Sequence, residues 1–285
     1  MNNFIKRTIS GIGFAAIMLA AFLTNQYVFG AVMLFALIVM MWEFLRMTCG
    51  KEYKYSQILS ILSGATLFTL IYCCRAFGLP GRMTILAFVP VFILMINSLY
   101  VKDKSRFDKF ANLYTAILYV AVPWSVLNFA AFSADGTFSG TLLLCFFCII
   151  WGSDVGAYLF GITLGQKYGK KLFPSISPKK SWIGFWGGMF MAIVVSVTLY
   201  FVGWFPNFSA CEATNIFNYI AIAVLLHITG VYGDLIESQW KRHYNVKDSG
   251  AIIPGHGGLL DRFDSALIAI PIGVIYLVIA HVLHI

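Results

Sequence analysis

Residues 142–151 read LLLCFFCIIW, ten successive apolar residues within a longer apolar run. A transmembrane β-strand alternates polar and apolar positions over about ten residues, so this continuous run predicts a helix. A helix needs about 20 residues to cross a bilayer, and runs of about that length recur along the chain. The expected spans are 8–24, 26–45, 57–74, 83–100, 111–131, 141–164, 183–204, 217–239 and 260–283. We therefore expect an all-α polytopic membrane protein with about nine transmembrane helices.

The composition excludes an ordinary soluble domain. Of 285 residues, 60% are apolar and 11% are charged, whereas soluble domains carry about 25% charged residues. Nine spans leave too little chain for a separate soluble domain. We expect one integral membrane domain over 1–285, with an acid-poor helical half at 1–140 and a half at 141–285 that carries the functional motifs. The first run follows Lys6 and Arg7 and is expected to be an uncleaved helix rather than a signal peptide.

The Lys and Arg residues predict the orientation, because cytoplasmic loops carry an excess of them. The nine-span arrangement places eighteen of the 20 basic residues on one side, and Arg75 and Arg82 on the other. The N-terminus is therefore expected in the cytoplasm and the C-terminus outside. This bias alone accounts for the basic loops at 46–56 and 101–110.

Acidic residues within spans are candidates for function, because a charge at mid-helix costs about 2.5–3.5 kcal/mol on insertion scales. Five of them lie within or at the ends of spans in the second half: Asp154, Asp234, Glu237, Asp261 and Asp264. In the first half, Glu43 lies three residues before Arg46. We expect these two to form an ion pair at the membrane interface.

Two predicted helices carry oxygen-bearing faces at the same level. Asp234, Glu237, Ser238 and Lys241 are spaced i, i+3, i+4 and i+7, which places them on one helical face. Asp261, Asp264 and Ser265 repeat the first three of these spacings on the next helix. A connection rich in glycine at 247–258 joins the two helices, and its backbone can approach a ligand closely.

Clustered carboxylates without a Cys or paired His ligand favour a hard cation such as Mg²⁺, which proteins usually hold together with substrate phosphates. Four basic side chains near these acids are available to phosphate: Lys241, Arg242, Lys247 and Arg262. The helix that starts near Leu259 adds its dipole and free N–H groups. A transporter with an intramembrane proton or cation relay is the alternative, but basic loops rich in glycine fit a phosphate site better.

A second group of residues lies at 151–188. Asp154 occurs deep in an apolar run and is followed by a basic loop. Ser177, Lys179, Lys180 and Ser181 are candidates to hold a phosphate, and Gly184, Gly187 and Gly188 permit close helix contact. Cys145 and Cys148 form a C-x-x-C on a buried helical face, and His227 lies on an apolar helix. We expect packing roles for these last three residues.

The motif Ser238-x2-Lys241-Arg242-x4-Lys247-Asp248-x-Gly250-x3-Pro254-Gly255-His256-Gly257-Gly258-x2-Asp261-Arg262-x-Asp264 resembles the signature of CDP-diacylglycerol synthases, the phosphatidate cytidylyltransferases. The signature is unbroken over 27 residues. Asp154 with Gly156-Ala157-Tyr158, and the stretch 176–182, resemble the second block of that family. Ile183 departs from it, because an acid often follows the Trp there.

The resemblance implies transfer of the cytidylyl group of CTP to phosphatidic acid, with Mg²⁺ and a monovalent cation such as K⁺ as candidate cofactors. It implies Asp234 and Asp261 as main metal ligands, with Ser238 and Asp264 as neighbouring oxygens. Asp248 either binds the metal or pairs with Lys247. The residues implied in catalysis are Asp234, Asp261, Lys241 and Asp264; those implied in substrate binding are Ser177, Lys179, Lys180, Ser238, Arg242, Lys247, His256, Gly257, Gly258 and Arg262.

His256 is expected to donate a hydrogen bond to phosphate, since a phosphate nucleophile needs no general base. The implied partners are CTP, phosphatidic acid, membrane lipids and a second copy of the chain. The small residues Gly184, Gly187 and Gly188 also favour a homodimer. No nucleic acid partner is expected. The expected location is a bacterial inner or plasma membrane, with the site facing the cytoplasm. A transporter is disfavoured because the acid-poor first half does not mirror the second, and an enzyme acting on a polyprenyl lipid is disfavoured by the unbroken signature.

Overall fold

The computed structural model of the protein describes residues 3–101, 107–205, 212–255, 257–280 and 282. They form two compact units, one of Met1–Phe138 with His243–Phe263, the other of Ser139–Arg242 with Asp264–Ile285. The expectation of a single domain over 1–285 stays a prediction. Because the boundary falls inside the last helix, each unit contains segments that are far apart in the sequence.

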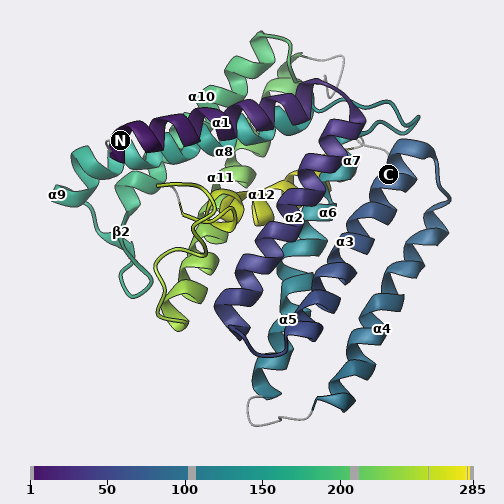
Figure 1. The fold of residues 1–285 in the computed structure, drawn as a ribbon. Coiled ribbons are helices and arrows are strands. Elements are labelled where there is room, and N and C mark those ends of the chain that lie inside the picture. The colour runs from purple at the N-terminus through teal and green to yellow at the C-terminus, as the bar shows by residue number, and fades with distance from the viewer. Residues whose placement is uncertain (1–2, 102–106, 206–211, 256, 281, 283–285) are drawn as a thin grey trace. The chain divides into compact units, whose positions relative to one another are not determined.

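Both units are built mainly of helices (Figure 1). In the described part of the chain, eight helical stretches are long and apolar enough to cross a membrane: Gln26–Cys49, Lys54–Phe77, Gly81–Tyr100, Phe107–Ala131, Thr141–Tyr168, Trp182–Phe201, Asn215–His243 and Leu260–Ile279. Thr8–Leu23 is a shorter apolar helix. The expected all-helical membrane architecture agrees with this pattern, whereas the total of nine spans and their orientation stay predictions.

The first unit is a set of helices connected mostly by short turns. Its elements are α1 (Asn3–Leu23), α2 (Gln26–Cys49), α3 (Lys54–Phe77), η1 (Gly81–Ala87), α4 (Phe88–Asn97), η2 (Ser98–Tyr100), η3 (Phe107–Phe110), α5 (Ala111–Ala116), η4 (Ile117–Ala121), α6 (Val122–Ser125) and α7 (Leu127–Ala131). Helices α2, α3 and α4 run side by side (Figure 1). Asn25 caps α2 by accepting hydrogen bonds from the backbone N of Tyr27 and Val28, both at 3.0 Å.

The span at 107–131 is a chain of short helical pieces rather than one continuous α-helix. A π-helical turn occupies Ile117–Ala121 and Pro123 follows it in α6. Proline lacks the N–H that would continue the helical hydrogen bonds, and π turns accommodate such interruptions. The indole Nε1 of buried Trp124 donates to the backbone oxygen of Met33, 2.8 Å away, which joins this span to α2.

The second unit contains α8 (Thr141–Phe160), η5 (Gly161–Gly165), α9 (Gln166–Tyr168), β1 (Lys171–Phe173), β2 (Ser177–Ser181), α10 (Trp182–Phe201), α11 (Glu212–His243) and α12 (Leu260–Ile279). Helices α8 and α10 touch through glycines. An added Cβ would lie 2.7 Å from the Gly187 oxygen at Gly156, and 2.9 Å from the Ala157 oxygen at Gly184. This confirms the close helix contact expected at 184–188 and shows that these small residues are used within the chain.

The segment expected to be a basic loop is a β-hairpin instead. Strands β1 and β2 pair antiparallel, with Lys171 opposite Ser181 and Phe173 opposite Ser177. Such short strands rich in Lys, Ser and Pro carry no alternation of apolar residues that a sequence pattern could reveal. The hairpin ends at Ser181, whose Oγ accepts a hydrogen bond from the backbone N of Gly184 at 3.2 Å and thereby caps α10.

Candidate active site

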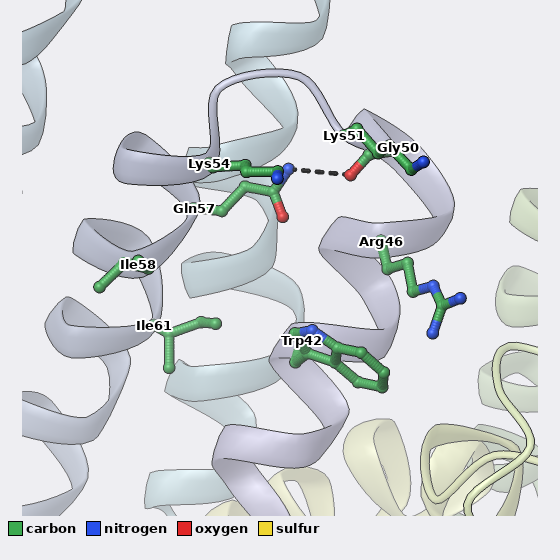
Figure 2. Close-up of a pocket in the computed structure, with 8 residues that line it drawn as sticks. All are labelled: Trp42, Arg46, Gly50, Lys51, Lys54, Gln57, Ile58 and Ile61. Atoms are coloured by element: carbon green, nitrogen blue, oxygen red, sulfur yellow. Dashed lines mark hydrogen bonds between the residues drawn. The ribbon is translucent and has the colours of Figure 1, made fainter.

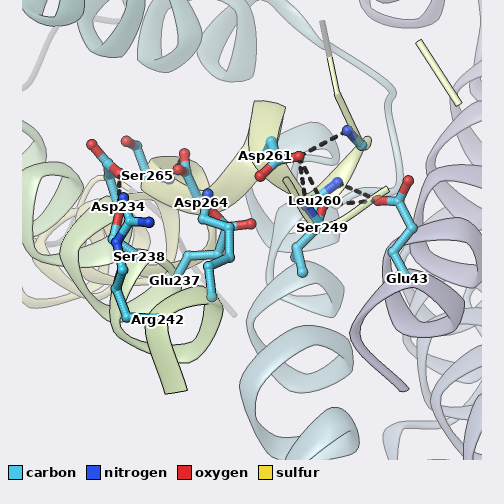
Figure 3. A network of polar contacts seen from close by, with 12 residues as sticks. Glu43, Asp234, Glu237, Ser238, Arg242, Ser249, Leu260, Asp261, Asp264 and Ser265 are labelled. Atoms are coloured by element: carbon cyan, nitrogen blue, oxygen red, sulfur yellow. Dashed lines mark hydrogen bonds and ion pairs between the residues drawn. The ribbon is translucent and has the colours of Figure 1, made fainter. Parts of the chain in front are cut away.

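Helices α11 and α12 cross at Gly233 in the second unit. An added Cβ at this position would lie 2.5 Å from the backbone oxygen of Asp264 and 3.1 Å from Cα of Ser265. Glycine alone allows the two backbones to come so close. Asp234 follows Gly233 directly, so the crossing brings the predicted acids Asp234 and Asp264 next to each other (Figure 3).

Asp234 is held by two side chains from different elements. Lys180 of β2 places its Nζ 2.5 Å from Oδ2 of Asp234, and Ser238, one helical turn along α11, donates from Oγ to Oδ1 at 3.2 Å. The carboxylate side chain is 32% exposed, so it stays accessible to a ligand. The structure thus joins a residue of the second motif block to the first predicted metal ligand.

A second ion pair lies on the same face of α11. Glu237 is fully buried, and its Oε2 lies 2.5 Å from Nζ of Lys241 at the i+4 position. The carboxylates of Asp234 and Asp154 also act electrostatically on Asp264, as does Lys241. The cluster therefore contains more acids than lysines, which concentrates negative charge near the helix crossing. Its acids are Asp154, Asp234, Glu237 and Asp264, and its lysines are Lys180 and Lys241.

The hairpin determines which of its lysines reaches this cluster. Neighbouring residues of a strand point to opposite sides; Lys180 is half-buried against Asp234, whereas Lys179 is exposed. Arg242 of α11 donates from Nε to the backbone oxygen of Ile176 at 3.4 Å. Ser177 lies half-buried at the start of β2. Of the predicted hairpin residues, Lys180 is thus the one that pairs with a predicted metal ligand.

Asp261 has a different set of partners, in the first unit. Its Oδ2 accepts hydrogen bonds from the backbone N of Ser249 at 2.9 Å, from Ser249 Oγ at 3.0 Å and from the backbone N of Gly258 at 2.8 Å (Figure 3). Hydrogen bonds to a carboxylate are stronger than those between neutral groups. Asp261 therefore closes the glycine-rich connection onto the first turn of α12, and its assignment as a metal ligand stays a prediction.

Glu43 corrects one of our expectations. It does not form an interfacial ion pair with Arg46; its side chain is fully buried, and its Oε2 accepts hydrogen bonds from the backbone N of Leu260 at 2.8 Å and from Ser249 Oγ at 3.4 Å. Arg46 instead lies over the ring of Trp42, 5.1 Å from its centroid. The expectation was wrong because it considered only residues near Glu43 in the sequence. A buried carboxylate needs hydrogen-bond donors, and here the distant Leu260 and Ser249 supply them.

The glycines of the connection leave room for these carboxylates. An added Cβ at Gly250 would lie 2.2 Å from Oε1 of Glu43, and one at Gly258 would lie 2.6 Å from its Oε2 and 2.2 Å from Ser249 Oγ. Gly257 has a φ of +87°, a conformation that favours glycine. These contacts explain the glycines by space and backbone conformation.

The other predicted residues in and beside the connection lie at the surface. Arg242, Lys247, Asp248 and Arg262 are exposed. The three cations among them, Arg242, Lys247 and Arg262, are available to a phosphate. His256 lies outside the described residues.

The oxygen donors fit a hard cation. Asp234, Ser238 and Asp264 come together at the helix crossing and supply oxygen only, the chemistry that Mg²⁺ prefers. In the described ranges, no group of three or more His, Cys, Asp and Glu side chains forms a ready-made metal site. Because Mg²⁺ is usually bound by one or two carboxylates with substrate phosphates and water, this arrangement suits a site that the substrate completes.

His227 and the two cysteines of the C-x-x-C were expected to have packing roles. His227 is buried, shares a hydrogen bond of 2.7 Å between its Nδ1 and Ser153 Oγ, and lies against the ring of Phe185. Cys145 is buried and Cys148 half-buried, and neither forms a disulfide. The burial of His227 and Cys145 agrees with the packing roles expected for them.

Together, the apolar helices of spanning length and the cluster of acids and lysines at a helix crossing define a class of polytopic membrane protein with ionisable side chains inside its helical stretches. The chain belongs to the Cytidylyltransferase family, which matches residues 5–280. This confirms the family expected from the motif at 238–264.

Several relatives called phosphatidate cytidylyltransferase are similar to the chain. One from Bacillus subtilis is 32% identical over 269 residues, which are 93% of this chain and 94% of the relative. One from Rickettsia bellii is 34% identical over 229 residues, 78% of this chain and 94% of the relative. One from Staphylococcus haemolyticus is 38% identical over 181 residues, and that match spans 64% of the length of each protein.

Proposed function

We propose that the protein transfers the cytidylyl group of CTP to phosphatidic acid, giving CDP-diacylglycerol and pyrophosphate, in phospholipid biosynthesis. The observation that carries this proposal is the meeting of Asp234, Ser238 and Asp264 with Lys180 in one cluster. Ser238 and Asp264 belong to the motif at 238–264 and Lys180 belongs to the second block, both of which resemble the cytidylyltransferase signature; Asp234 lies one helical turn before Ser238. Family membership and the names of the relatives support the same reaction.

The chemistry requires alignment and charge neutralisation rather than a protein nucleophile. An oxygen of the lipid phosphate attacks the α-phosphorus of CTP, the new P–O bond forms, and the bond to the bridging oxygen of the β-phosphate breaks to release pyrophosphate. The lipid phosphate is already anionic, so no base has to remove a proton. What the protein must supply is positioning and preorganised charge.

The described residues suit this task. Asp234 and Asp264, with Ser238, would hold Mg²⁺, and Asp261 and Asp248 are further candidate ligands. Bound Mg²⁺ would neutralise phosphate charge and orient the reacting oxygens. Lys180 and Lys241 are held in place by Asp234 and Glu237, so their positive charges are already positioned when an anionic substrate binds. A monovalent cation such as K⁺ is a second candidate cofactor.

The resemblance supplies further candidates for substrate binding. The candidates are Lys179, Arg242, Lys247 and Arg262, together with Ser177, His256 and the backbone of Gly257 and Gly258. The loops that carry them are those predicted to face the cytoplasm, where CTP is found. We therefore propose an active site on the cytoplasmic side of a bacterial inner or plasma membrane, with N-terminus inside and C-terminus outside. A homodimer is proposed on the resemblance alone. Gly184 and Gly187 contact α8 of the same chain, so they are no longer an argument for a dimer interface.

The test is a transfer assay with the detergent-purified full chain. CTP labelled in its cytosine ring is incubated with phosphatidic acid, with and without Mg²⁺, and the lipid fraction is analysed. We expect labelled CDP-diacylglycerol that depends on Mg²⁺ and on phosphatidic acid. If label enters the lipid fraction only when a polyprenyl phosphate is supplied, the acceptor is that phosphate rather than phosphatidic acid. The absence of lipid product with a folded protein under every divalent ion would favour the transporter instead.

A further inference from the structure

A surface pocket lies in the first unit between the C-terminal end of α2 and the start of α3. Its volume is about 600 Å³. Figure 2 shows the residues that line it, among them the cations Arg46, Lys51 and Lys54 and the apolar residues Trp42, Ile58 and Ile61. These residues belong neither to the cluster at the crossing of α11 and α12 nor to the hydrogen bonds around Asp261.

The rim of the pocket is a structured turn. The side-chain Nε2 of Gln57 donates to the backbone oxygen of Gly50 at 3.2 Å (Figure 2). It also donates to the backbone oxygen of Glu52 at 2.6 Å. Gly50 ends α2 with a φ of +62°, and the ring of Tyr53 packs against Phe110 at a centroid distance of 5.6 Å. The cations of the turn are therefore presented on a fixed backbone, which lowers the entropy lost on binding.

The charge of the pocket is positive. The lining contains three cations and no acidic residue. Two acids adjoin lining residues in the sequence, and neither lines the pocket. Glu43 is buried and accepts from the backbone N of Leu260, and Glu52 forms an ion pair with Lys109 at 3.1 Å. Lys54 is also the first residue of α3, so the positive end of the helix dipole adds to the attraction for an anion.

One wall of the pocket, formed by Trp42, Ile58 and Ile61, is apolar. Trp42 is 40% exposed and Ile58 is 55% exposed, although both lie in helices of membrane-spanning length. Cations at the end of a spanning helix, with an aromatic and aliphatic side chains just below them, match the layers of a lipid from headgroup to acyl chain. A soluble phosphate compound would leave this apolar wall without a partner.

We propose that this pocket binds an anionic phospholipid, with its phosphate between Arg46, Lys51 and Lys54 and its glycerol and first acyl methylenes against Trp42, Ile58 and Ile61. The excess of basic residues in cytoplasmic loops explains why cations occur here, but it requires neither a pocket nor an apolar wall. The site goes beyond the proposed cytidylyl transfer, because its occupancy requires no CTP and no turnover.

Native mass spectrometry of the delipidated full chain tests the proposal. The probe is phosphatidylglycerol, which is not the proposed acceptor, and no CTP is added. The variant R46Q/K51Q/K54Q should bind it at least tenfold more weakly than the unaltered protein. The matched control K102Q/K104Q/R106Q removes the same charge from another loop predicted on the same side and should bind normally. Equal weakening in both, or none in the first, overturns the proposal.

Two further comparisons separate a lipid from other ligands. Zwitterionic phosphatidylcholine should bind weakly, and millimolar inorganic phosphate should not displace phosphatidylglycerol. I58Q changes only the apolar wall at an exposed position, so it should weaken the lipid complex while the protein elutes from gel filtration unchanged. If phosphate displaces the lipid and I58Q has no effect, the pocket recognises a soluble phosphate and the proposal is wrong.

Discussion

The carboxylate of Glu43 accepts a hydrogen bond from the backbone N of Leu260 at 2.8 Å, across 217 positions of sequence. Leu260 is the first residue of α12, where backbone N–H groups lack partners within the helix. Ser249 Oγ is shared between Glu43 and Asp261, at 3.4 and 3.0 Å. One buried residue of α2 thus fixes both the start of α12 and the connection that carries the family motif.

Replacing Glu43 should therefore loosen that connection. We expect E43A to destabilise the protein by about 1–3 kcal/mol, because buried donors lose their acceptor, and E43Q to cost less because it keeps one oxygen. Turnover should fall with stability, since the motif residues lose their support. The measurement is the fraction of protein that stays monodisperse after heating in detergent, together with the transfer assay.

E52Q is a matched control, because it makes the same chemical change in a partly exposed ion pair with Lys109. Surface pairs contribute about 0–1 kcal/mol, so E52Q should melt close to the unaltered protein. Equal effects of E43Q and E52Q would contradict the proposed importance of the buried contact.

Neighbouring lysines of β2 should differ in their importance. Lys180 pairs with Asp234, whereas Lys179 is exposed and its backbone oxygen accepts from Gln166. We expect K180M to lower kcat/KM at least tenfold, equivalent to about 1.4 kcal/mol, because a positioned charge beside the predicted metal ligand is lost. K179M should have a smaller effect. Steady-state kinetics with both substrates decide, and the reverse order would place the critical cation on the other face of the strand.

Much of the fold could be predicted because a membrane imposes a simple rule. A helix of about 20 apolar residues is required wherever the chain crosses, and the predicted runs at 26–45, 183–204 and 260–283 overlap α2, α10 and α12. The interruption at Ile117–Ala121 and the hairpin at Lys171–Ser181 escaped prediction. Both depend on local backbone hydrogen bonding, which hydropathy does not record.

The site was predictable where its residues are close in sequence or lie on one helical face. Asp234 and Ser238 were expected together and share a hydrogen bond. Glu43 was misassigned because its partners are more than 200 positions away, and only its position inside an apolar run hinted at a role. Gly233 was overlooked, since a glycine at a helix crossing looks in sequence like any other glycine.

Substitutions of Gly233 test the crossing of α11 and α12. A methyl group there would lie 2.5 Å from the backbone oxygen of Asp264, which cannot rotate away as a side chain would. Forcing extra volume into a packed contact costs about 1–3 kcal/mol, so G233A should lower thermal stability and reduce turnover by displacing Asp264. Gly230 lies one turn earlier, and its added Cβ would meet nothing closer than 3.6 Å. G230A should therefore be tolerated, and a tolerated G233A would show that the helices can separate.

The two predicted metal ligands should respond differently to loss of their charge. D234N removes one partner of a partly exposed ion pair, so stability should change by about 0–1 kcal/mol while turnover is abolished. D261N weakens three hydrogen bonds that close the connection, so it should abolish turnover and also lower stability by about 1–3 kcal/mol. Thermal stability and transfer are measured on the same samples across a Mg²⁺ titration, after EDTA has reduced the unaltered protein to background. Turnover that survives in D261N would assign Asp261 to closing the loop alone, and turnover that survives in D234N would remove the central residue of the proposed site.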